Sequence, residues 1–186
     1  MEEFDIAIIG GGPAGIMAAI AASADLNIVL LEKNSSLGSK LLITGGGRCN
    51  ITNEKPIKKL LNSFHDKNFL KHSFYTFTNE MLLDLFRNRG LDFIVEDNNR
   101  VFPETEKSQD ILAILKYYLK DITIKYNYEV SDIKKEDNFI INNDIIAEKV
   151  IIATGGATFP KTGSTGDGYY LTDNPVTDIK YGLVPL

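Results

Sequence analysis

Three short, mainly apolar runs divide the chain. They cover residues 4–9, 27–31 and 150–153. Their length and nearly continuous apolar character are typical of strands that are buried on both faces of a parallel sheet. Residues 13–23, between the first two runs, are rich in alanine, and Pro13 suits the first turn of a helix. The chain is therefore predicted to begin with a βαβ unit.

The region after the second run changes from irregular to helical. Residues 33–55 follow neither the helical nor the strand period and predict a long functional loop, whereas residues 56–90 follow the helical pattern. Thr78 is expected to cap a helix over residues 79–89. Ser108 is expected to cap a further helix in the same way.

In most of the remaining chain the residue pattern has the two-residue period of a strand. Residues 92–103 predict a hairpin around a turn at 97–99, and residues 122–130 predict a strand. Residues 138–153 predict short strands around a tight turn, the last of them apolar throughout. The predicted fold is thus α/β, with a parallel sheet, an antiparallel meander and additional helices.

Composition and charge narrow the possible functions. The chain has 186 residues, the size of one large domain, and a net charge of −5 with acids and bases interspersed. This balance argues against nucleic acid or an anionic membrane as the main partner, although it leaves room for a local basic patch. The first ten residues, MEEFDIAIIG, lack a signal peptide, and no apolar run is long enough to span a bilayer. A cytoplasmic protein is expected.

The cysteine count excludes further classes. Cys49 is the chain's single cysteine, which rules out an intrachain disulfide and any Cys-rich metal site. A flavin disulfide reductase needs two cysteines, so that class is excluded as well. No metal site is expected.

A phosphate-binding glycine turn follows the first run. "DIAIIGGGPAG" fits G-x-G-x-x-G with Gly10, Gly12 and Gly15. In this motif the first glycine permits the tight turn, the second lets a pyrophosphate approach the backbone, and the third allows close helix–strand packing. Pro13 and Ala14 open the helix, whose N-terminus offers free N–H groups to phosphate. The alternative is a glycine turn that serves packing alone.

A carboxylate lies where the ribose of a bound nucleotide would be. Glu32 ends the second run, about twenty residues after the turn, and an acid there disfavours a 2′-phosphate. The nucleotide is therefore expected to be NAD or FAD, with the adjacent Lys33 as a further contact.

The end of the last run favours FAD over NAD. Ala153, Thr154 and Gly155 follow a meander and resemble the second fingerprint of FAD-binding two-domain oxidoreductases, whereas an NAD-only domain has no need of the meander. The glycines of "GSTGDGYY" follow no strand in the required register. If NAD(P)H is the electron donor, it is therefore expected to bind without a dedicated domain.

Four blocks together resemble one bacterial family. "DIAIIGGGPAGIMAA", "GSKLLITGGGRCNITN", "RVFPETEKSQDIL" and "VIIATGGATFPKTGSTGDGY" are similar to the aminoacetone oxidase-family FAD-binding enzymes, which include a bile-acid enone reductase. The resemblance implies a Rossmann-like FAD-binding domain over residues 1–186. It also implies that this domain is incomplete, because the family's substrate domain and the C-terminal part of its FAD site have no counterpart here.

The resemblance also gives the second glycine cluster a role. In such enzymes FAD runs on in extended form, and three glycines let its ribityl chain and ring approach the backbone. Arg48 is suited to phosphate oxygens or to the pyrimidine edge of the flavin. The residues assigned to the cofactor in this segment are Lys40, Thr44, Gly45, Gly46, Gly47, Arg48, Cys49, Asn50 and Asn53, and Val130 is assigned to the adenine edge. The alternative is a mobile surface loop.

Three functions follow from these residues. The first is an FAD-dependent oxidoreductase that transfers hydride through the flavin N5 to or from an unidentified small molecule, with no catalytic side chain assigned. The second is a flavin-binding lobe without turnover, which self-associates through its uncovered face. The third is a tRNA-modifying flavoprotein, against which the acidic balance argues.

Overall fold

The computed structural model describes residues 1–22, 25–172 and 175–179. The strands are β1 (Glu2–Ile9), β2 (Ile28–Leu31), β3 (Thr52–Asn53), β4 (Phe93–Glu96), β5 (Arg100–Pro103), β6 (Thr123–Lys125), β7 (Ile133–Lys135), β8 (Phe139–Ile141) and β9 (Ile145–Ile152). The α-helices are α1 (Pro13–Ala22), α2 (Ile57–Leu61), α3 (Lys67–Thr76), α4 (Asn79–Arg87) and α5 (Ser108–Tyr118).

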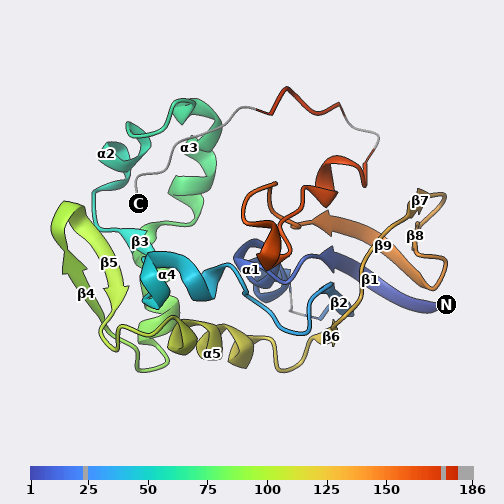
Figure 1. Cartoon of the computed structure of the whole chain (residues 1–186), viewed down its shortest axis with the longest axis horizontal. Coiled ribbons are helices and arrows are strands. Elements are labelled where there is room, and N and C mark those ends of the chain that lie inside the picture. Colours follow the sequence, from blue (N-terminus) through green and yellow to red (C-terminus); the bar gives the residue numbers. More distant parts are fainter. Residues whose placement is uncertain (23–24, 173–174, 180–186) are drawn as a thin grey trace.

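A six-stranded sheet forms the centre of the fold. Its order is β6-β2-β1-β9-β8-β7, in which β6, β2, β1 and β9 are parallel and β7–β8–β9 form an antiparallel meander. β1 lies between β2 and β9, so that Ile6 pairs with Ile28 on one side and with Lys149 on the other (Figure 1). The predicted α/β fold with its βαβ unit and meander is confirmed.

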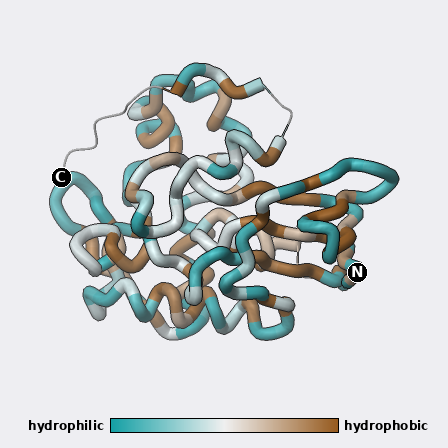
Figure 2. Tube along the Cα trace, turned by 45° about the vertical axis from the view of Figure 1, so that its right-hand side comes forward, coloured by the Kyte–Doolittle hydropathy of each residue, from teal (hydrophilic) through white to brown (hydrophobic). Residues whose placement is uncertain are grey.

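The apolar strands divide the core between the two faces of this sheet. Ile8 and Leu30 face one side, where they pack with Ile16 of α1 and with residues of α5. Ala7 and Val29 face the other side, together with residues of the meander. Because successive side chains of a strand point to opposite faces, a continuous apolar run fills both layers. Figure 2 shows the result as hydrophobic strands in the interior and hydrophilic turns outside.

A smaller unit lies to one side of the main sheet. A second sheet, in the order β3-β5-β4, is accompanied there by α2, α3 and α4 (Figure 1). The predicted hairpin at 92–103 is confirmed as β4 and β5, and the predicted cap of α4 is confirmed because Thr78 Oγ1 accepts a hydrogen bond of 3.2 Å from Met81 N–H. The predicted helical region 56–90 consists of three separate helices.

Other local expectations are corrected. Ser108 does not cap α5; its hydroxyl donates to the carbonyl of Leu42 at 2.9 Å and so ties the helix to the loop after β2. That loop contains a 3₁₀ turn over Leu41–Gly47. The predicted strand 122–130 is confined to β6, because the chain turns away after Lys125. The predicted helix 13–23 ends at Ala22, and Ser23 lies outside the described residues.

Candidate functional site

The carboxyl ends of β1, β2 and β9 surround a cavity of about 160 Å³. β1 lies between β2, which follows it in the chain through α1, and β9, which the chain reaches only after β6, and ligands of open α/β sheets bind where the strand order reverses in this way. The predicted site residues that line this first cavity are Gly10, Gly12, Pro13, Ala14, Glu32, Lys33, Lys40, Val130, Ala153, Thr154 and Gly155. Eleven residues from five separate segments of the chain are thus brought together.

The three glycines of the first turn differ in what surrounds them. A Cβ on Gly10 would lie 2.5 Å from the carbonyl oxygen of Ala153, and a Cβ on Gly15 would lie 1.9 Å from that of Gly10. Gly10 also has a φ of +106°, a conformation that favours glycine. A Cβ on Gly12 would meet no protein atom within 4 Å. Internal packing therefore requires Gly10 and Gly15, whereas Gly12 leaves open space in the cavity.

That open space faces unused hydrogen-bond donors. The backbone N–H groups of Gly12 and Ala14 have no acceptor among the described residues, while that of Gly11 donates to Glu32. Gly12 directly precedes α1, and Ala14 lies in its first turn, where the helix dipole is positive. Free donors with a positive dipole and no intervening side chain fit the pyrophosphate of a dinucleotide.

Glu32 is buried and shapes the glycine turn. Its Oε2 accepts from Gly11 N–H at 2.7 Å, and its Oε1 accepts from both the backbone N–H and the side-chain amide of Asn34 at 2.7 Å. A carboxylate has about four acceptor positions, so one remains on Oε2 for a ligand hydroxyl. The geometry fits a ribose, and it gives Glu32 a second, structural task that the sequence analysis did not foresee.

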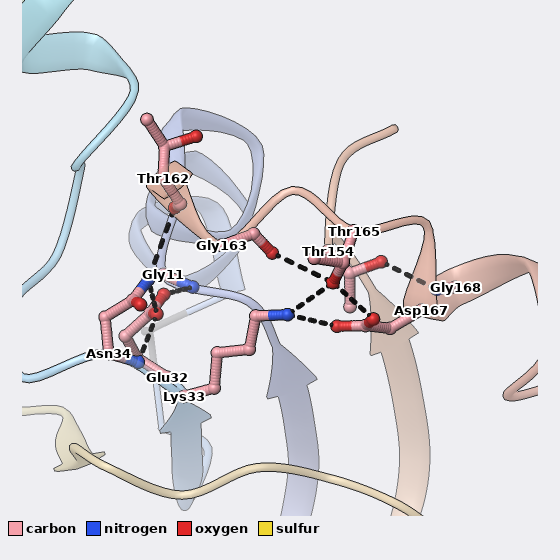
Figure 3. Close-up of polar contacts among 10 residues, drawn as sticks. All are labelled: Gly11, Glu32, Lys33, Asn34, Thr154, Thr162, Gly163, Thr165, Asp167 and Gly168. Carbon is pink, nitrogen blue, oxygen red and sulfur yellow. Dashed lines mark hydrogen bonds and ion pairs between the residues drawn. The ribbon is translucent and has the colours of Figure 1, made fainter. Parts of the chain in front are cut away.

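The segment after β9 closes over the same cavity. Lys33 Nζ donates to Asp167 and to Thr165 Oγ1, each at 2.6 Å, and the Asn34 side chain donates to the carbonyl of Thr162 at 3.3 Å (Figure 3). Partial burial opposes ionisation of Asp167, but hydrogen bonds from Lys33 and Thr165 outweigh it and hold the pKa of this carboxyl below its ordinary value. Lys33 therefore joins β2 to this segment, and its ammonium is already paired.

The residues that hold this segment over the cavity were not predicted from the sequence. Asn34, Thr162, Gly163, Ser164 and Asp167 also line the first cavity. The available signal was the glycine spacing of "GSTGDGYY", which marks a turn close to a ligand rather than a second dinucleotide motif.

The end of β9 and the residues before β7 form the remaining walls. Gly155 adopts a φ of +77°, and Thr154 Oγ1 accepts from Gly168 N–H at 3.0 Å. Val130 is buried beside Tyr128, whose hydroxyl is bonded to Asp144. Burial and this aspartate raise the pKa of Tyr128, so the ring stays neutral. Tyr128 and Val130 thus add an apolar part to the lining of the first cavity, next to β2, because Tyr128 N–H donates to the Glu32 carbonyl at 2.9 Å.

A second cavity of about 480 Å³ adjoins the first. Both are lined by Pro13, Ala14 and Lys40, so they meet at the N-terminus of α1. Lys40 Nζ donates to the carbonyl of Thr158 at 2.8 Å, and burial lowers its pKa. The further lining residues are Met17, Leu41, Thr44, Cys49, Asn50, Ile51, Phe77, Leu82, Phe86, Ile111 and Leu115. Most of them are apolar, which suits a flat aromatic group.

Cys49 lines the second cavity, and its thiol is unreactive there. Burial raises the pKa of its thiol, although a hydrogen bond involving Thr44 opposes the shift. Because the thiolate is the reactive form, a raised pKa keeps the sulfur unreactive. In this structure Cys49 is therefore a packed residue of the cavity wall.

The rest of the second glycine cluster lies outside both cavities. Gly45, Gly46 and Gly47 have positive φ values of 57°, 68° and 89°, so the turn depends on glycine. Arg48 donates to Glu96 at 2.6 Å and to Glu106 at 3.0 Å and stacks 4.2 Å from the centroid of Phe102. These carboxylates raise the pKa of Arg48, and its charge is already balanced.

Asn53 also serves the second sheet in this structure. Its side-chain amide donates to the carbonyl of Asn98 at 2.8 Å, and its Oδ1 accepts from Lys55 N–H at 3.1 Å. Arg48, Asn53 and the three glycines are therefore not brought together with the first cavity, and their contact with a cofactor stays a prediction. Gly15, which packs α1 against β1, lines neither cavity.

Among the described residues, no group of three or more His, Cys, Asp or Glu side chains lies close enough to hold a metal ion. No described helix is long and apolar enough to cross a membrane.

Comparison with known proteins gives matches over nearly the whole chain. The model of the HI0933-like protein Rossmann domain matches residues 4–180. A 3-dehydro-bile acid delta(4,6)-reductase of Clostridium scindens is 33% identical over 175 residues, covering 89% of this chain and 42% of its own length. A ribosomal RNA dihydrouridine synthase of Escherichia coli is 30% identical over 196 residues, covering 100% of this chain and 48% of its own length. The chain spans less than half the length of these relatives.

Solved structures share the fold at lower identity. The open conformation of a flavocytochrome c3 fumarate reductase superposes with a TM-score of 0.62 at 20% identity, over 86% of this chain and 35% of that one. A 3-ketosteroid-delta4-(5alpha)-dehydrogenase from Rhodococcus jostii RHA1 superposes with a TM-score of 0.60 at 15% identity, over 83% of this chain and 46% of that one. At these identities the likeness concerns the fold.

Proposed function

Because the chain belongs to the HI0933-like family of Rossmann-domain proteins, we propose that it is the FAD-binding part of a flavin-dependent oxidoreductase. One observation carries the proposal: the two cavities meet at Ala14, whose free N–H group lies next to that of Gly12 in the first cavity. A buried carboxylate lies beyond them on one side and an apolar space on the other. An extended dinucleotide that ends in a flat ring needs this order of groups.

The chain's residues divide the work of binding. Glu32 accepts a ribose hydroxyl, Gly12 and Ala14 donate to the pyrophosphate, and Val130 offers backbone groups to the adenine. The apolar walls around Cys49 hold the ring end and exclude water from it. Bound FAD supplies the two-electron chemistry, since its N5 atom accepts or donates a hydride.

The reaction we propose is the saturation of a carbon–carbon double bond conjugated to a carbonyl group. The two curated relatives support it, because a delta(4,6)-reductase of a 3-dehydro bile acid and a synthase of dihydrouridine both reduce such a bond. A substrate of this kind takes up a hydride at the carbon distal to the carbonyl and a proton at the carbon next to it. NAD(P)H is the proposed source of the electrons.

The two relatives differ in the size of their substrates. The first candidate substrate for this protein is a free enone, which would be the small molecule that the sequence left unidentified. The second is a uridine within RNA, the substrate class that corresponds to the name of the Escherichia coli relative, whose similarity extends over the whole of this chain.

The test is a flavin assay followed by a turnover assay on the whole protein as cells make it. We expect a yellow protein that releases FAD on denaturation and that NAD(P)H bleaches under anaerobic conditions. Addition of an α,β-unsaturated ketone should restore the flavin absorbance, whereas its saturated analogue should not. A protein that carries no flavin would refute the proposal, and one that binds FAD but reacts with neither class of substrate would support the lobe without turnover.

A further inference from the structure

The helices α2 and α3 and the residues beside them form a positively charged part of a chain that is acidic overall. Residues 55–77 contain five lysines and a single acid, so they have a formal charge of +4 and leave −9 for the rest of a chain whose total is −5. The two helices contact each other and lie side by side at one end of the molecule (Figure 1). The local basic patch that the overall composition left open is therefore present.

The lysines of this patch have no acidic partner. Lys58, Lys59, Lys67 and Lys71 are exposed, and none of them forms an ion pair among the described residues. The one acid, Asp66, caps α3 by accepting from Phe69 N–H at 3.1 Å. It serves the helix end and is not paired with a lysine, so the positive charge of the patch faces solvent.

Two aromatic side chains of α3 are exposed as well. Phe69 is 80% exposed and Tyr75 is 55% exposed, although large apolar groups are normally covered. Lys67, Lys71 and Tyr75 follow one another at a spacing of four residues, which places them on one side of α3. We call Lys58, Lys59, Lys67, Phe69, Lys71 and Tyr75 the lysine–aromatic surface.

We propose that the lysine–aromatic surface binds the RNA that carries the substrate nucleotide. This inference rests on the second candidate substrate of the proposed function. Unpaired lysines attract the phosphate backbone, and exposed aromatic rings offer platforms on which unpaired bases stack. That combination is typical of proteins that hold single-stranded nucleic acid.

The distribution of side chains distinguishes RNA from a lipid surface. A helix that lies in a membrane interface separates a continuous apolar face from a charged face. The half-buried Leu70 and Phe74 of α3 face inward, and no residue of this helix is fully buried. Its exposed residues include Lys67, Lys71 and Tyr75 along one side and Phe69 on another side, with polar residues between them, so they form no continuous apolar face.

The surface is also connected to the candidate site. α3 is followed directly by Phe77, which lines the second cavity together with Phe86. The C-terminal end of α3 therefore lies beside the apolar space that we assign to the flavin ring, and this space is the proposed destination of a nucleotide flipped out of the bound RNA.

The test compares two variants of the whole protein that lose the same charge. One carries Lys58→Gln, Lys59→Gln, Lys67→Gln and Lys71→Gln. The control carries Lys107→Gln, Lys116→Gln, Lys135→Gln and Lys149→Gln, which are exposed lysines elsewhere on the chain. The probe is a fluorescein-labelled oligouridylate, and its anisotropy is followed between about 50 and 200 mM salt.

We expect the first variant to bind the probe at least about tenfold more weakly, with a salt slope smaller by about 3, because each lost single-strand phosphate contact removes about 0.7. The control should match the parent in both respects. A Phe69→Ala, Tyr75→Ala variant should lose about tenfold in affinity and keep the parent's slope, since stacking releases no counterions.

Several outcomes would overturn the proposal. They are a parent that does not bind the probe, equal losses in the first variant and the control, and lysine-dependent binding to phosphatidylserine vesicles without binding to RNA. Flavin absorbance of each sample separates the two proposals. A flavin-loaded parent that ignores RNA refutes the surface alone, whereas a flavin-free parent refutes the FAD assignment and leaves the anisotropy result to decide the surface.

Discussion

Replacement of Gly12 by valine is expected to abolish FAD binding while leaving the stability of the fold nearly unchanged. A Cβ at Gly12 meets no protein atom within 4 Å, and its φ is not in the left-handed region. The free energy of unfolding should therefore change by less than about 1 kcal/mol, with the loss of glycine entropy in the unfolded chain as a small gain. The new side chain fills the space in front of the N–H groups of Gly12 and Ala14.

The expected loss of FAD affinity follows from these two donors. Each hydrogen bond to a charged phosphate contributes about 1.5–3 kcal/mol. Loss of both costs about 3–6 kcal/mol, which corresponds to a 10²- to 10⁴-fold weaker Kd. The Gly12→Val protein should emerge from purification colourless, with secondary structure and urea midpoint close to those of the parent.

Gly15→Ala provides the matched comparison. Its Cβ would lie 1.9 Å from the backbone oxygen of Gly10, so α1 must move away from β1. Overpacking of this kind costs about 1–3 kcal/mol or more, and the urea midpoint should fall. A Gly12→Val protein that is fully loaded with flavin, or one that is as unstable as Gly15→Ala, would refute this account of the turn.

Three further predictions concern the same cavity. Glu32→Ala should weaken FAD retention by about 1–3 kcal/mol in a fluorescence titration, and an unchanged affinity would exclude the ribose contact. The pKa of Asp167 is lower in the folded than in the unfolded chain, so its pairing with Lys33 stabilises the fold. This stabilisation is complete above the ordinary aspartate pKa of about 3.9 and is lost as the pH falls through the pKa of the folded state. Asp167→Asn should therefore flatten the acid limb of stability against pH, and identical limbs in variant and parent would contradict the pairing. In a flavin-bound crystal structure the adenine edge should lie within hydrogen-bond distance of the Val130 backbone, and an adenine bound elsewhere would show that assignment to be wrong.

Local patterns were sufficient to predict the main sheet and the nucleotide turn. The apolar runs at 4–9 and 150–153 correspond to β1 and β9, and the spacing of Gly10 and Gly15 predicted contacts that the structure contains. Such features depend on burial and on backbone sterics, which a residue and its near neighbours largely determine.

Side-chain partners from distant segments could not be predicted. Arg48 was expected at phosphate or flavin, but in the structure two carboxylates 48 and 58 residues away hold it. Lys33 pairs with Asp167 across 134 residues in the same way. The sequence pattern of a lysine or arginine beside a glycine turn is the same whether an anionic ligand or a protein carboxylate neutralises the positive charge. Only the folded neighbourhood distinguishes the two.

The position of β1 in the sheet has a consequence for synthesis of the protein. The strand formed first, β1, pairs on one side with β9, whose register joins Ile6 to Lys149. At about 5–20 residues per second, the ribosome needs roughly 7–30 s to add the 143 residues from position 7 to position 149. During this delay one hydrogen-bonding edge of an apolar strand is open to other nascent chains, and such edges promote aggregation. The yield of folded protein should therefore depend on how well chaperones protect this strand until β9 arrives.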